Sequence, residues 1–490
     1  MNLSDLVERI PGARLRGPGD VQVRRAVHDS RRVREGDLFV ALPGTQMDGH
    51  RFVQVALESG AAAAVVQHEV DLPGDPPLLV VPDPREALGI AAHALAGDPT
   101  RHMTVCGVTG TTGKTTTTYL VRSIFEQAGR PAGVLGTIGY VIGRREIPSL
   151  LTTPDADDGA GYFAEMREAG LQAAVMEVSS HALHQRRTAG IDFDVGAFTN
   201  LSPEHLDYHE DMVSYSEAKG RLFAGLREDA TAVLNADEDA SRAFAEVTRA
   251  RVLWYGLEAA ADVTAENLRS GTAGSRFTLV TPRGRTQVRT RLLGTHNVLN
   301  CLTAAAVAEA LGLPPGAVAA GLEAVETVRG RLEPVPTTLP LSVLVDYAHK
   351  TDALEHALAT VRELVHGDGR LILVFGCGGD RDRQKRPAMA KVAERLADRI
   401  FVTNDNPRSE VPEAIAEEIL AGFDAPDAVT VELDRREAIA HALEEARAGD
   451  VVIIAGKGHE TYQIIGDATR PFDDREVAAE VLRRLEGRGT

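Results

Sequence analysis

Residues 103–118, with the sequence MTVCGVTGTTGKTTTT, constrain the fold of this chain more than any other segment. An apolar strand here breaks into glycines and then into a Lys-Thr helix start. Such a segment is typical of a phosphate-binding loop, because backbone N–H groups and a helix N-terminus converge on one anion. Gly110 and Gly113 would permit the tight turn, Lys114 would supply positive charge, and Thr115 would offer a hydroxyl to Mg²⁺. We therefore predict a phosphate site at this strand end.

The glycine spacing marks this loop as a variant. The common P-loop pattern would need its first glycine at Val108, and Gly107 lies one residue earlier. A dinucleotide-binding fingerprint fits less well, because Gly107, Gly110 and Gly113 recur at every third position. A glycine-rich turn without a ligand is the remaining alternative. The strand, the Lys-Thr pair and an amphipathic helix expected at 119–128 together favour the phosphate loop.

The order of predicted strands and helices indicates an α/β protein of three domains. A chain of 490 residues is too long for one hydrophobic core. Residues 1–98 read as a small α/β domain, and residues 99–329 and 330–490 as two units of alternating strands and helices, which favours parallel sheets covered on both faces. The predicted strands are 38–42, 62–66, 132–138, 172–178, 194–199, 231–235, 341–345, 371–375, 399–403 and 451–455.

Chemically active side chains follow the predicted strands of residues 99–329. Glu177 and Ser179 come at the end of one strand, and His205 follows the next. Ligands of open parallel sheets bind at the carboxyl ends of the strands, so these residues should lie near the phosphate loop, where Glu177 and His205 could hold Mg²⁺ beside a triphosphate. Lys219 lies on a helix just after this loop, where, taken alone, it reads as a surface lysine.

The histidines of this region allow a second interpretation. His181, His184, His205 and His209 could form a zinc site, although no thiolate accompanies them and the phosphate loop already requires Mg²⁺.

Residues 330–490 place a polar loop after each strand, at 346–349, 376–381, 404–408 and 456–460. Several such loops at the carboxyl ends of parallel strands predict a second ligand-binding face.

Charge and cysteine content narrow the function classes. A net charge of −18 disfavours nucleic acid or an anionic membrane as the main partner. Cys106, Cys301 and Cys377 lie far apart, which argues against a disulfide framework and for a reducing compartment. We expect each to be a small core residue. The sequence has no segment resembling a signal peptide or a membrane span, so we predict a cytoplasmic protein that does not insert into membranes.

The motifs jointly resemble the Mur ligase family along essentially the whole chain. They are TGTTGKT at 109–115, EVSSH at 177–181, HLD at 205–207, AK at 218–219, HNVLN at 296–300, GR at 330–331 and DYAH at 346–349, in the family's order. The resemblance implies an N-terminal domain (1–98) for the UDP end of the substrate and a central P-loop ATPase domain (99–329). It also implies a Rossmann-like C-terminal domain (330–490) for the incoming amino acid.

The implied activity is an ATP-dependent amide-bond-forming ligase of peptidoglycan biosynthesis. It would add meso-diaminopimelate to the D-Glu γ-carboxylate of UDP-N-acetylmuramoyl-L-alanyl-D-glutamate through an acyl phosphate, acting as a monomer without nucleic acid. The same ligase using L-lysine or L-ornithine, a folylpolyglutamate-type ligase, and a nucleotide-dependent switch stay open as alternatives.

The resemblance also assigns roles to individual residues. Lys114, Glu177, His205 and Lys219 would be catalytic, and Mg²⁺ would be held by Thr115, Glu177, His205 and Lys219, the last as a carbamate derived from CO₂. ATP would contact Gly110, Thr111, Thr112, Gly113, Lys114, Thr115, Thr116, Asn297, Asn300, Arg331, Asp346 and His349. The nucleotide-sugar peptide would contact Ser30, Thr45, Gln46, Thr152, Thr153, Ser179, Gln185 and Arg187. The amino acid would contact Arg381, Asp405, Asn406, Arg408, Gly456 and Glu460.

Within the last set, Arg408 ends the sequence Asp-Asn-Pro-Arg, which the family associates with meso-diaminopimelate. A guanidinium can pair with the distal carboxylate of that amino acid, and lysine has no such group.

Overall fold

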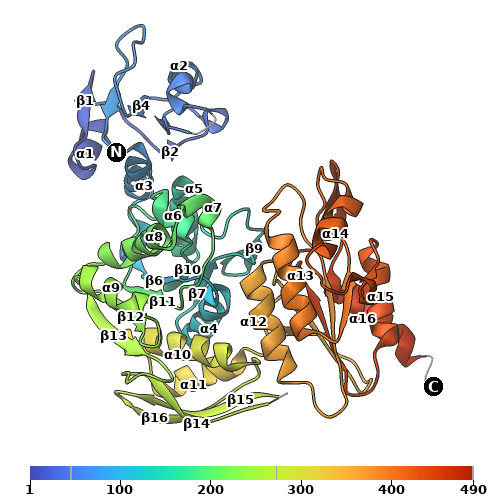
Figure 1. Ribbon diagram of the computed structural model, residues 1–490. Helices are drawn as coiled ribbons and strands as arrows, with labels where there is room; N and C mark the ends of the chain where they lie inside the picture. Colours follow the sequence, from blue (N-terminus) through green and yellow to red (C-terminus); the bar gives the residue numbers. More distant parts are fainter. Residues whose placement is uncertain (45–46, 272, 488–490) are drawn as a thin grey trace. The chain divides into compact units, whose positions relative to one another are not determined.

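The computed structural model describes residues 1–44, 47–271 and 273–487. It contains two compact units (Figure 1). The first comprises Met1–Ala265, Leu279–Thr286 and Leu299–Leu322, and the second comprises Glu266–Thr278, Gln287–Val298 and Glu323–Thr490.

The first unit begins with a five-stranded sheet in the order β1-β5-β4-β3-β2. Its strands are β1 (Arg14–Arg16), β2 (Ala26–Val27), β3 (Leu38–Val40), β4 (Ala63–Val66) and β5 (Leu78–Val80), and only β1 is antiparallel to its neighbour. Its helices are α1 (Leu3–Arg9), α2 (Val53–Glu58) and α3 (Pro84–Leu95), with short 3₁₀ turns η1 (Ser30–Arg32), η2 (Gly49–Phe52) and η3 (Pro99–His102). Asp83 caps α3 by accepting from the N–H groups of Arg85 and Glu86, and Pro84 occupies the first helical position.

An eight-stranded sheet follows, in the order β13-β12-β11-β6-β10-β7-β8-β9. The strands are β6 (Thr104–Thr109), β7 (Ala132–Leu135), β8 (Tyr140–Ile142), β9 (Arg145–Ile147), β10 (Ala173–Glu177), β11 (Val195–Phe198), β12 (Thr231–Asn235) and β13 (Arg251–Tyr255). The six strands from β13 to β7 are parallel, and β8 and β9 form an antiparallel edge. The parallel strands predicted in this region are therefore confirmed.

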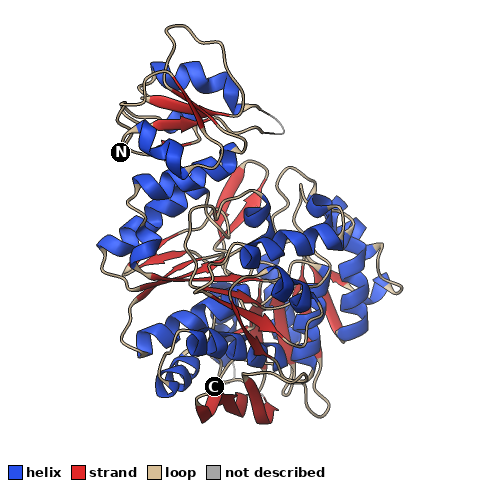
Figure 2. Cartoon of the chain, turned by 90° about the vertical axis from the view of Figure 1, so that its left-hand side faces the viewer, coloured by secondary structure: helices blue, strands red, loops and turns tan. Residues whose placement is uncertain are grey.

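Helices cover both faces of this sheet (Figures 1 and 2). They are α4 (Lys114–Gln127), α5 (Ala156–Glu168), α6 (Ser180–His184), α7 (Leu206–His209), α8 (Met212–Ala224) and α9 (Ala240–Val247). Because β6 connects to β7 in one direction and β10 to β11 in the other, right-handed crossovers place α4 and α6 on opposite faces. Such a reversal of connection direction is a topological switch point, where ligands of open α/β sheets bind at the carboxyl ends of the strands.

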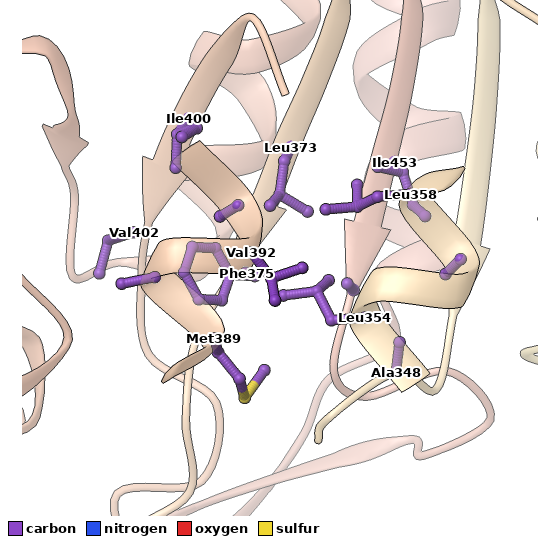
Figure 3. Packing of buried hydrophobic residues seen from close by; sticks show 14 of the residues in the cluster. Ala348, Leu354, Leu358, Leu373, Phe375, Met389, Val392, Ile400, Val402 and Ile453 are labelled. Carbon is purple, nitrogen blue, oxygen red and sulfur yellow. The ribbon is translucent and has the colours of Figure 1, made fainter. Parts of the chain in front are cut away.

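A six-stranded sheet in the order β17-β18-β22-β19-β20-β21 organises the second unit. The strands are β17 (Glu333–Pro334), β18 (Ser342–Asp346), β19 (Leu371–Phe375), β20 (Arg399–Val402), β21 (Thr430–Val431) and β22 (Val451–Ala455), and only β17 is antiparallel. Helices α12 (Thr351–Arg362), α13 (Lys385–Leu396), α14 (Pro412–Leu420), α15 (Arg435–Glu445) and α16 (Asp474–Glu486) accompany them, with a 3₁₀ turn η4 (Pro426–Ala428). Figure 3 shows Leu373 and Phe375 of β19 packed with Leu354 and Leu358 of α12 and Met389 of α13.

Several elements were not predicted from the sequence. They include the β8–β9 edge, a three-stranded sheet of β14 (Thr264–Gly271), β15 (Gly274–Thr281) and β16 (Gly284–Thr290), the hairpin of β23 (Tyr462–Ile465) and β24 (Ala468–Pro471), and helices α10 (Thr295–Ala310) and α11 (Pro315–Ala324).

Two smaller expectations are also tested. The helix start expected at the Lys-Thr pair is confirmed, because Gly113 adopts a φ of 82° and turns the chain directly into α4, which begins at Lys114 and covers most of the expected 119–128 segment. Cys106, Cys301 and Cys377 are buried free thiols, as predicted. Across the described ranges, the helices are all too short or too polar to cross a membrane.

Candidate active site

The phosphate loop connects β6 to α4. Gly110 has a φ of 148° and Gly113 a φ of 82°. A Cβ atom at Gly110 would collide with Thr199 Oγ1, and one at Gly113 with Asn300 Oδ1. Both positions therefore require glycine, for backbone conformation and for space.

Two lysines lie against this loop. Lys114 Nζ donates to the carbonyls of Gly110 and Thr111, each at 2.8 Å, and Lys219 Nζ donates to the Gly110 carbonyl at 2.8 Å. Lys219 is only 1% exposed, and its ammonium lies 4.3 Å from the centre of the Tyr215 ring. The expectation of a surface lysine is therefore wrong, because α8 packs against β6 and turns this side chain inward.

Glu177 ends β10 and is fully buried beside α4. Its Oε2 accepts from the Thr115 hydroxyl at 2.9 Å and from the Thr137 hydroxyl at 3.0 Å, and its Oε1 accepts from the Thr137 N–H at 2.8 Å. The hydroxyl and carboxylate oxygens of Thr115 and Glu177 are the hard donors that Mg²⁺ prefers, so these two residues fit that ion.

The sequence analysis did not identify Thr137. It lies in a loop directly after β7, between Gly136 and Gly139, and the other site residues likewise follow strands. Its position follows from the register, since β7 and β6 both flank β10.

His205 lies in a cluster of rings. It has a φ of 57°, its ring meets that of His181 edge-on with centroids 4.5 Å apart, and its Nε2 is 3.6 Å from Glu204 Oε2. His209 Nε2 is 3.0 Å from Ser180 Oγ. In the part of the chain that the structure describes, no group of three or more His, Cys, Asp or Glu side chains is arranged to hold a metal ion, which gives the zinc interpretation no support.

Four of the residues assigned to the nucleotide-sugar peptide share one hydrogen-bond network. Thr153 Oγ1 donates to the Glu177 carbonyl at 2.8 Å and accepts from the Ser179 N–H at 3.0 Å. Arg187 donates to the Thr153 carbonyl at 3.1 Å and to Gln185 Oε1 at 2.6 Å. The network thus connects the loop before α5 to the end of β10.

Thr152 contacts Thr137, and the residues around Ser30 contact helix α5. Thr137 Oγ1, whose proton goes to Glu177, lies 3.1 Å from Thr152 Oγ1 and can accept from it. Ser30 begins η1, and its neighbours are held to α5: His28 Nδ1 is 3.1 Å from Asp157, and Arg32 Nη2 is 2.7 Å from Asp158. The hydrogen bond to Asp157 raises the pKa of His28. Thr45 and Gln46 lie outside the described residues.

The residues assigned to ATP outside the loop divide between the two units. Asn300 is buried beside Gly113, and Thr117 Oγ1 donates to its Oδ1 at 3.4 Å. Asn297 Nδ2 donates to the Leu293 carbonyl at 2.7 Å.

In the second unit, Arg331, Asp346 and His349 surround Tyr347. The Arg331 guanidinium lies 5.2 Å from the centre of the Tyr347 ring, and Asp346 accepts from the N–H groups of Leu332 and Ala348 at 2.7 and 2.8 Å. Burial lowers the pKa of His349 to about 4 and raises that of Asp346.

The loops after β19, β20 and β22 meet in the second unit and bring the assigned amino-acid residues together. Arg408 has a φ of 54°, and its Nη1 donates to the Gly379 carbonyl at 2.7 Å. Asn406 Nδ2 donates to Glu460 Oε2 at 2.9 Å, and Gly456 lies beside Asp405. Arg381 is exposed at the rim of this group.

Two cations in this group were not assigned from the sequence. Lys457 contacts Asp405, Asn406 and Glu460. Arg435 pairs with Asp474 at 2.7 Å, both side chains being fully buried. Lys457 could have been noticed in the sequence, because lysine is rare in this arginine-rich chain, whereas nothing in the sequence distinguishes Arg435.

Three segments match known domains. Residues 23–95 match the Mur ligase family, catalytic domain; residues 108–308 match the Mur ligase middle domain; and residues 330–458 match the Mur ligase, glutamate ligase domain.

Relatives align with the chain over its full length. The chain is 45% identical over 512 residues to a UDP-N-acetylmuramoyl-L-alanyl-D-glutamate–2,6-diaminopimelate ligase of Geobacter metallireducens, covering 100% of both proteins. It is 44% identical to the protein of the same name in Geobacillus thermodenitrificans, covering 99% of both. A solved structure of a ligase with this name aligns over 99% of both chains with a TM-score of 0.73 and 32% identity.

Proposed function

This chain belongs to the Mur ligase family, and from that premise we propose that it joins meso-diaminopimelate to UDP-N-acetylmuramoyl-L-alanyl-D-glutamate. The reaction forms an amide at the D-Glu γ-carboxylate, is driven by ATP and belongs to peptidoglycan biosynthesis. The folylpolyglutamate-type alternative is set aside, because the similarity to diaminopimelate ligases extends over the whole chain at 45% identity.

The position of Arg408 is the observation that most supports meso-diaminopimelate as the amino acid. Its backbone N–H donates to the Ile464 carbonyl at 3.1 Å and its Nη1 to the Gly379 carbonyl at 2.7 Å, so the guanidinium is held beside Asn406. An arginine held in this way can pair with the distal carboxylate of meso-diaminopimelate. L-lysine and L-ornithine have no such group, and either would leave the arginine's charge unbalanced.

In the mechanism, the D-Glu γ-carboxylate attacks the γ-phosphorus of ATP, and ADP leaves. The amine of diaminopimelate then attacks the carbonyl carbon of the acyl phosphate, loses a proton, and phosphate leaves with the bonding electron pair. The phosphate loop and Lys114 balance the charge that spreads over the transferred group. A covalent enzyme intermediate is unnecessary, because the substrate itself is activated.

Mur ligases use ATP and Mg²⁺, and this chain has oxygen donors that suit the ion. We assign Thr115 and Glu177 to it, because their hydroxyl and carboxylate oxygens are in direct contact. When bound, Mg²⁺ neutralises phosphate charge. His205 and a carbamylated Lys219 complete the proposed set. A carbamate would convert the buried ammonium into an anionic oxygen ligand, a change that an arginine could not undergo.

The remaining assignments follow from the same premise. We propose that residues 1–98 bind the UDP end, residues 99–329 bind ATP, and residues 330–490 supply the amino-acid site. The Thr153, Ser179, Gln185 and Arg187 network would receive the peptide and sugar groups. We place the enzyme in the cytoplasm, in keeping with its three buried cysteines, which are not in disulfides. We also propose that it acts as a monomer.

The test is phosphate release with ATP, Mg²⁺ and UDP-N-acetylmuramoyl-L-alanyl-D-glutamate, comparing meso-diaminopimelate, L-lysine and L-ornithine and checking the product mass. Strong preference for meso-diaminopimelate supports the proposal. Preference for L-lysine or L-ornithine would retain the ligase and remove the role of Arg408 in choosing the amino acid. Phosphate release without any amino acid would favour a nucleotide-dependent switch.

A further inference from the structure

Lys457 is a fully buried lysine directly after β22. Its side chain is 0% exposed, although lysine is among the residues that are most rarely buried. It lies between three of the residues proposed to bind the incoming amino acid: Asp405, Asn406 and Glu460. A buried ammonium in this position can influence the amino-acid site.

The hydrogen-bonding capacity of Lys457 is used within the protein. Its Nζ is 3.4 Å from Asp405 Oδ1, 3.1 Å from Asn406 Oδ1 and 3.1 Å from Glu460 Oε2. An ammonium has three N–H groups, so each has an acceptor in this arrangement. Lys457 therefore acts on a substrate through these neighbours and not by contact of its own.

The first effect is on the orientation of Asn406. Its Oδ1 accepts from Lys457 Nζ at 3.1 Å and from the Ile464 N–H at 2.9 Å. With two donors facing the oxygen, the amide NH₂ must point the other way, where it donates to Glu460 Oε2 at 2.9 Å. Lys457 also donates to that oxygen. Asn406 and Lys457 therefore both donate to Oε2 of Glu460, and neither of these two bonds uses its Oε1.

The second effect is on charge. Burial raises the pKa of Glu460, and Lys457 opposes that rise. Burial would also raise the pKa of Asp405, but the charges of Lys457 and Arg435 outweigh it and lower the pKa. Arg435 is already paired with Asp474 through two bonds of 2.7 Å. Lys457 thus acts to lower the pKa of both Asp405 and Glu460.

We propose that Lys457 is the positioning residue of the amino-acid site, holding Asn406 and Glu460 in one orientation to receive the ammonium group of the incoming amino acid. This inference rests on the proposed function, because it requires Asn406 and Glu460 to contact the amino acid. Asp405 and Glu460 both lie against the Lys457 ammonium. A carboxylate has two acceptor oxygens, so Glu460 can still accept from the substrate ammonium through Oε1.

The experiment compares Lys457→Met and Lys457→Arg with Lys391→Met, which removes an exposed lysine from α13 of the same unit. The kcat and the KM values for meso-diaminopimelate, ATP and the UDP-dipeptide substrate are measured by phosphate release, and folding by thermal melting. Lys457→Met should raise the KM for meso-diaminopimelate by about 10- to 100-fold, the loss expected for a hydrogen bond to a charged group. The KM for ATP should be unchanged.

Rescue separates positioning from a merely structural role. Lys457→Arg keeps the charge and should recover part of the KM for meso-diaminopimelate, whereas Lys391→Met should match the wild type. If Lys457→Met fails to fold, Lys457→Gln, which keeps two N–H donors without the charge, is measured in its place. A wild-type KM for meso-diaminopimelate in the folded variant overturns the inference, as does an equal loss in every kinetic constant.

The wild-type enzyme distinguishes this outcome from failure of the proposed function. If the wild type shows no phosphate release that depends on meso-diaminopimelate, the proposed function fails and the inference with it. If the wild type is active and only the Lys457 result is negative, the inference alone fails.

Discussion

Lys114 and Lys219 donate hydrogen bonds to the same carbonyl oxygen, that of Gly110, each at 2.8 Å. One lysine comes from the start of α4 and the other from α8. A carbonyl oxygen has two lone pairs and can accept both bonds. Two ammonium groups that share one acceptor repel each other, and a carbamate at Lys219 would replace one of the two positive charges by a negative one. This gives a physical reason for expecting Lys219 to react with CO₂.

Replacement of Lys219 by Ala should abolish turnover, and Lys219→Arg should do the same, because a guanidinium cannot be converted into the carbamate. Phosphate release measures the loss, and intact mass in bicarbonate buffer detects the modification. Lys391→Ala, on the exposed face of α13, is the control and should retain activity. Normal turnover in Lys219→Ala would remove Lys219 from the metal site.

Glu177→Gln should lower the turnover rate by about 10²- to 10³-fold, the usual effect of deleting one electrostatic element of an active site. The amide keeps the volume but removes the charge proposed to hold Mg²⁺. Phosphate release is measured over a Mg²⁺ titration, and the half-saturating concentration should rise. Thr137→Val is the matched control, because it removes one hydroxyl bond to Glu177 and keeps the N–H bond to Oε1. An unchanged Mg²⁺ requirement in Glu177→Gln would contradict the assignment.

Arg408→Ala should raise the KM for meso-diaminopimelate and reduce its preference over L-lysine. In the wild type that preference could reach about 10⁴-fold, because a site built for a carboxylate is left unpaired when the carboxylate is missing. Competition assays with both amino acids measure the ratio. Arg470→Ala changes an exposed arginine on β24 and should leave the ratio as it is. The same ratio in Arg408→Ala would show that another residue selects the amino acid.

The ion pair of His28 and Asp157 should stabilise the fold over a limited pH range. The bond to Asp157 raises the pKa of His28 above 6.5, so its contribution is complete below 6.5 and is lost as the pH rises through the raised value. Although burial acts against ionisation, the bond to His28 lowers the pKa of Asp157 below 3.8, so its contribution is lost only as the pH falls through that lower value.

Asp157→Asn should therefore lower the melting temperature more at about pH 5 than at about pH 9. Asp158→Asn, which weakens the bond to Arg32, is the control, since an arginine stays charged throughout. An equal effect of Asp157→Asn at both pH values would contradict the pairing.

His93 should make the protein less stable in acid. It is 1% exposed on α3, and burial lowers its pKa from 6.5 to about 4. Since the unfolded chain binds the proton more readily, unfolding is favoured as the pH falls below 6.5, by up to about 3 kcal/mol when the pH reaches the folded pKa. His93→Leu should flatten this dependence, which denaturant unfolding at several pH values measures. A wild type and variant with parallel pH profiles would contradict it.

The sequence alone determined the local features of this protein. The glycines and the Lys-Thr pair predicted the phosphate loop, and apolar runs located the parallel strands. Because the carboxyl ends of parallel strands share one edge, the contact between Thr115 and Glu177 could also be anticipated in kind. Two-residue periodicity did not reveal β14 or the β8–β9 edge, since β14 is largely exposed and β8 and β9 have three residues each.

Only the tertiary structure decided which distant side chains share a neighbour. Lys219 read as a surface residue until the packing of α8 on β6 brought its ammonium to the Gly110 carbonyl. Lys457 meets Asp405 and Glu460 because β19 lies between β20 and β22 and their loops meet above it. Residue type and spacing describe one element at a time, whereas burial and charge pairing depend on the order of strands in the sheet, which sets the environment of every loop.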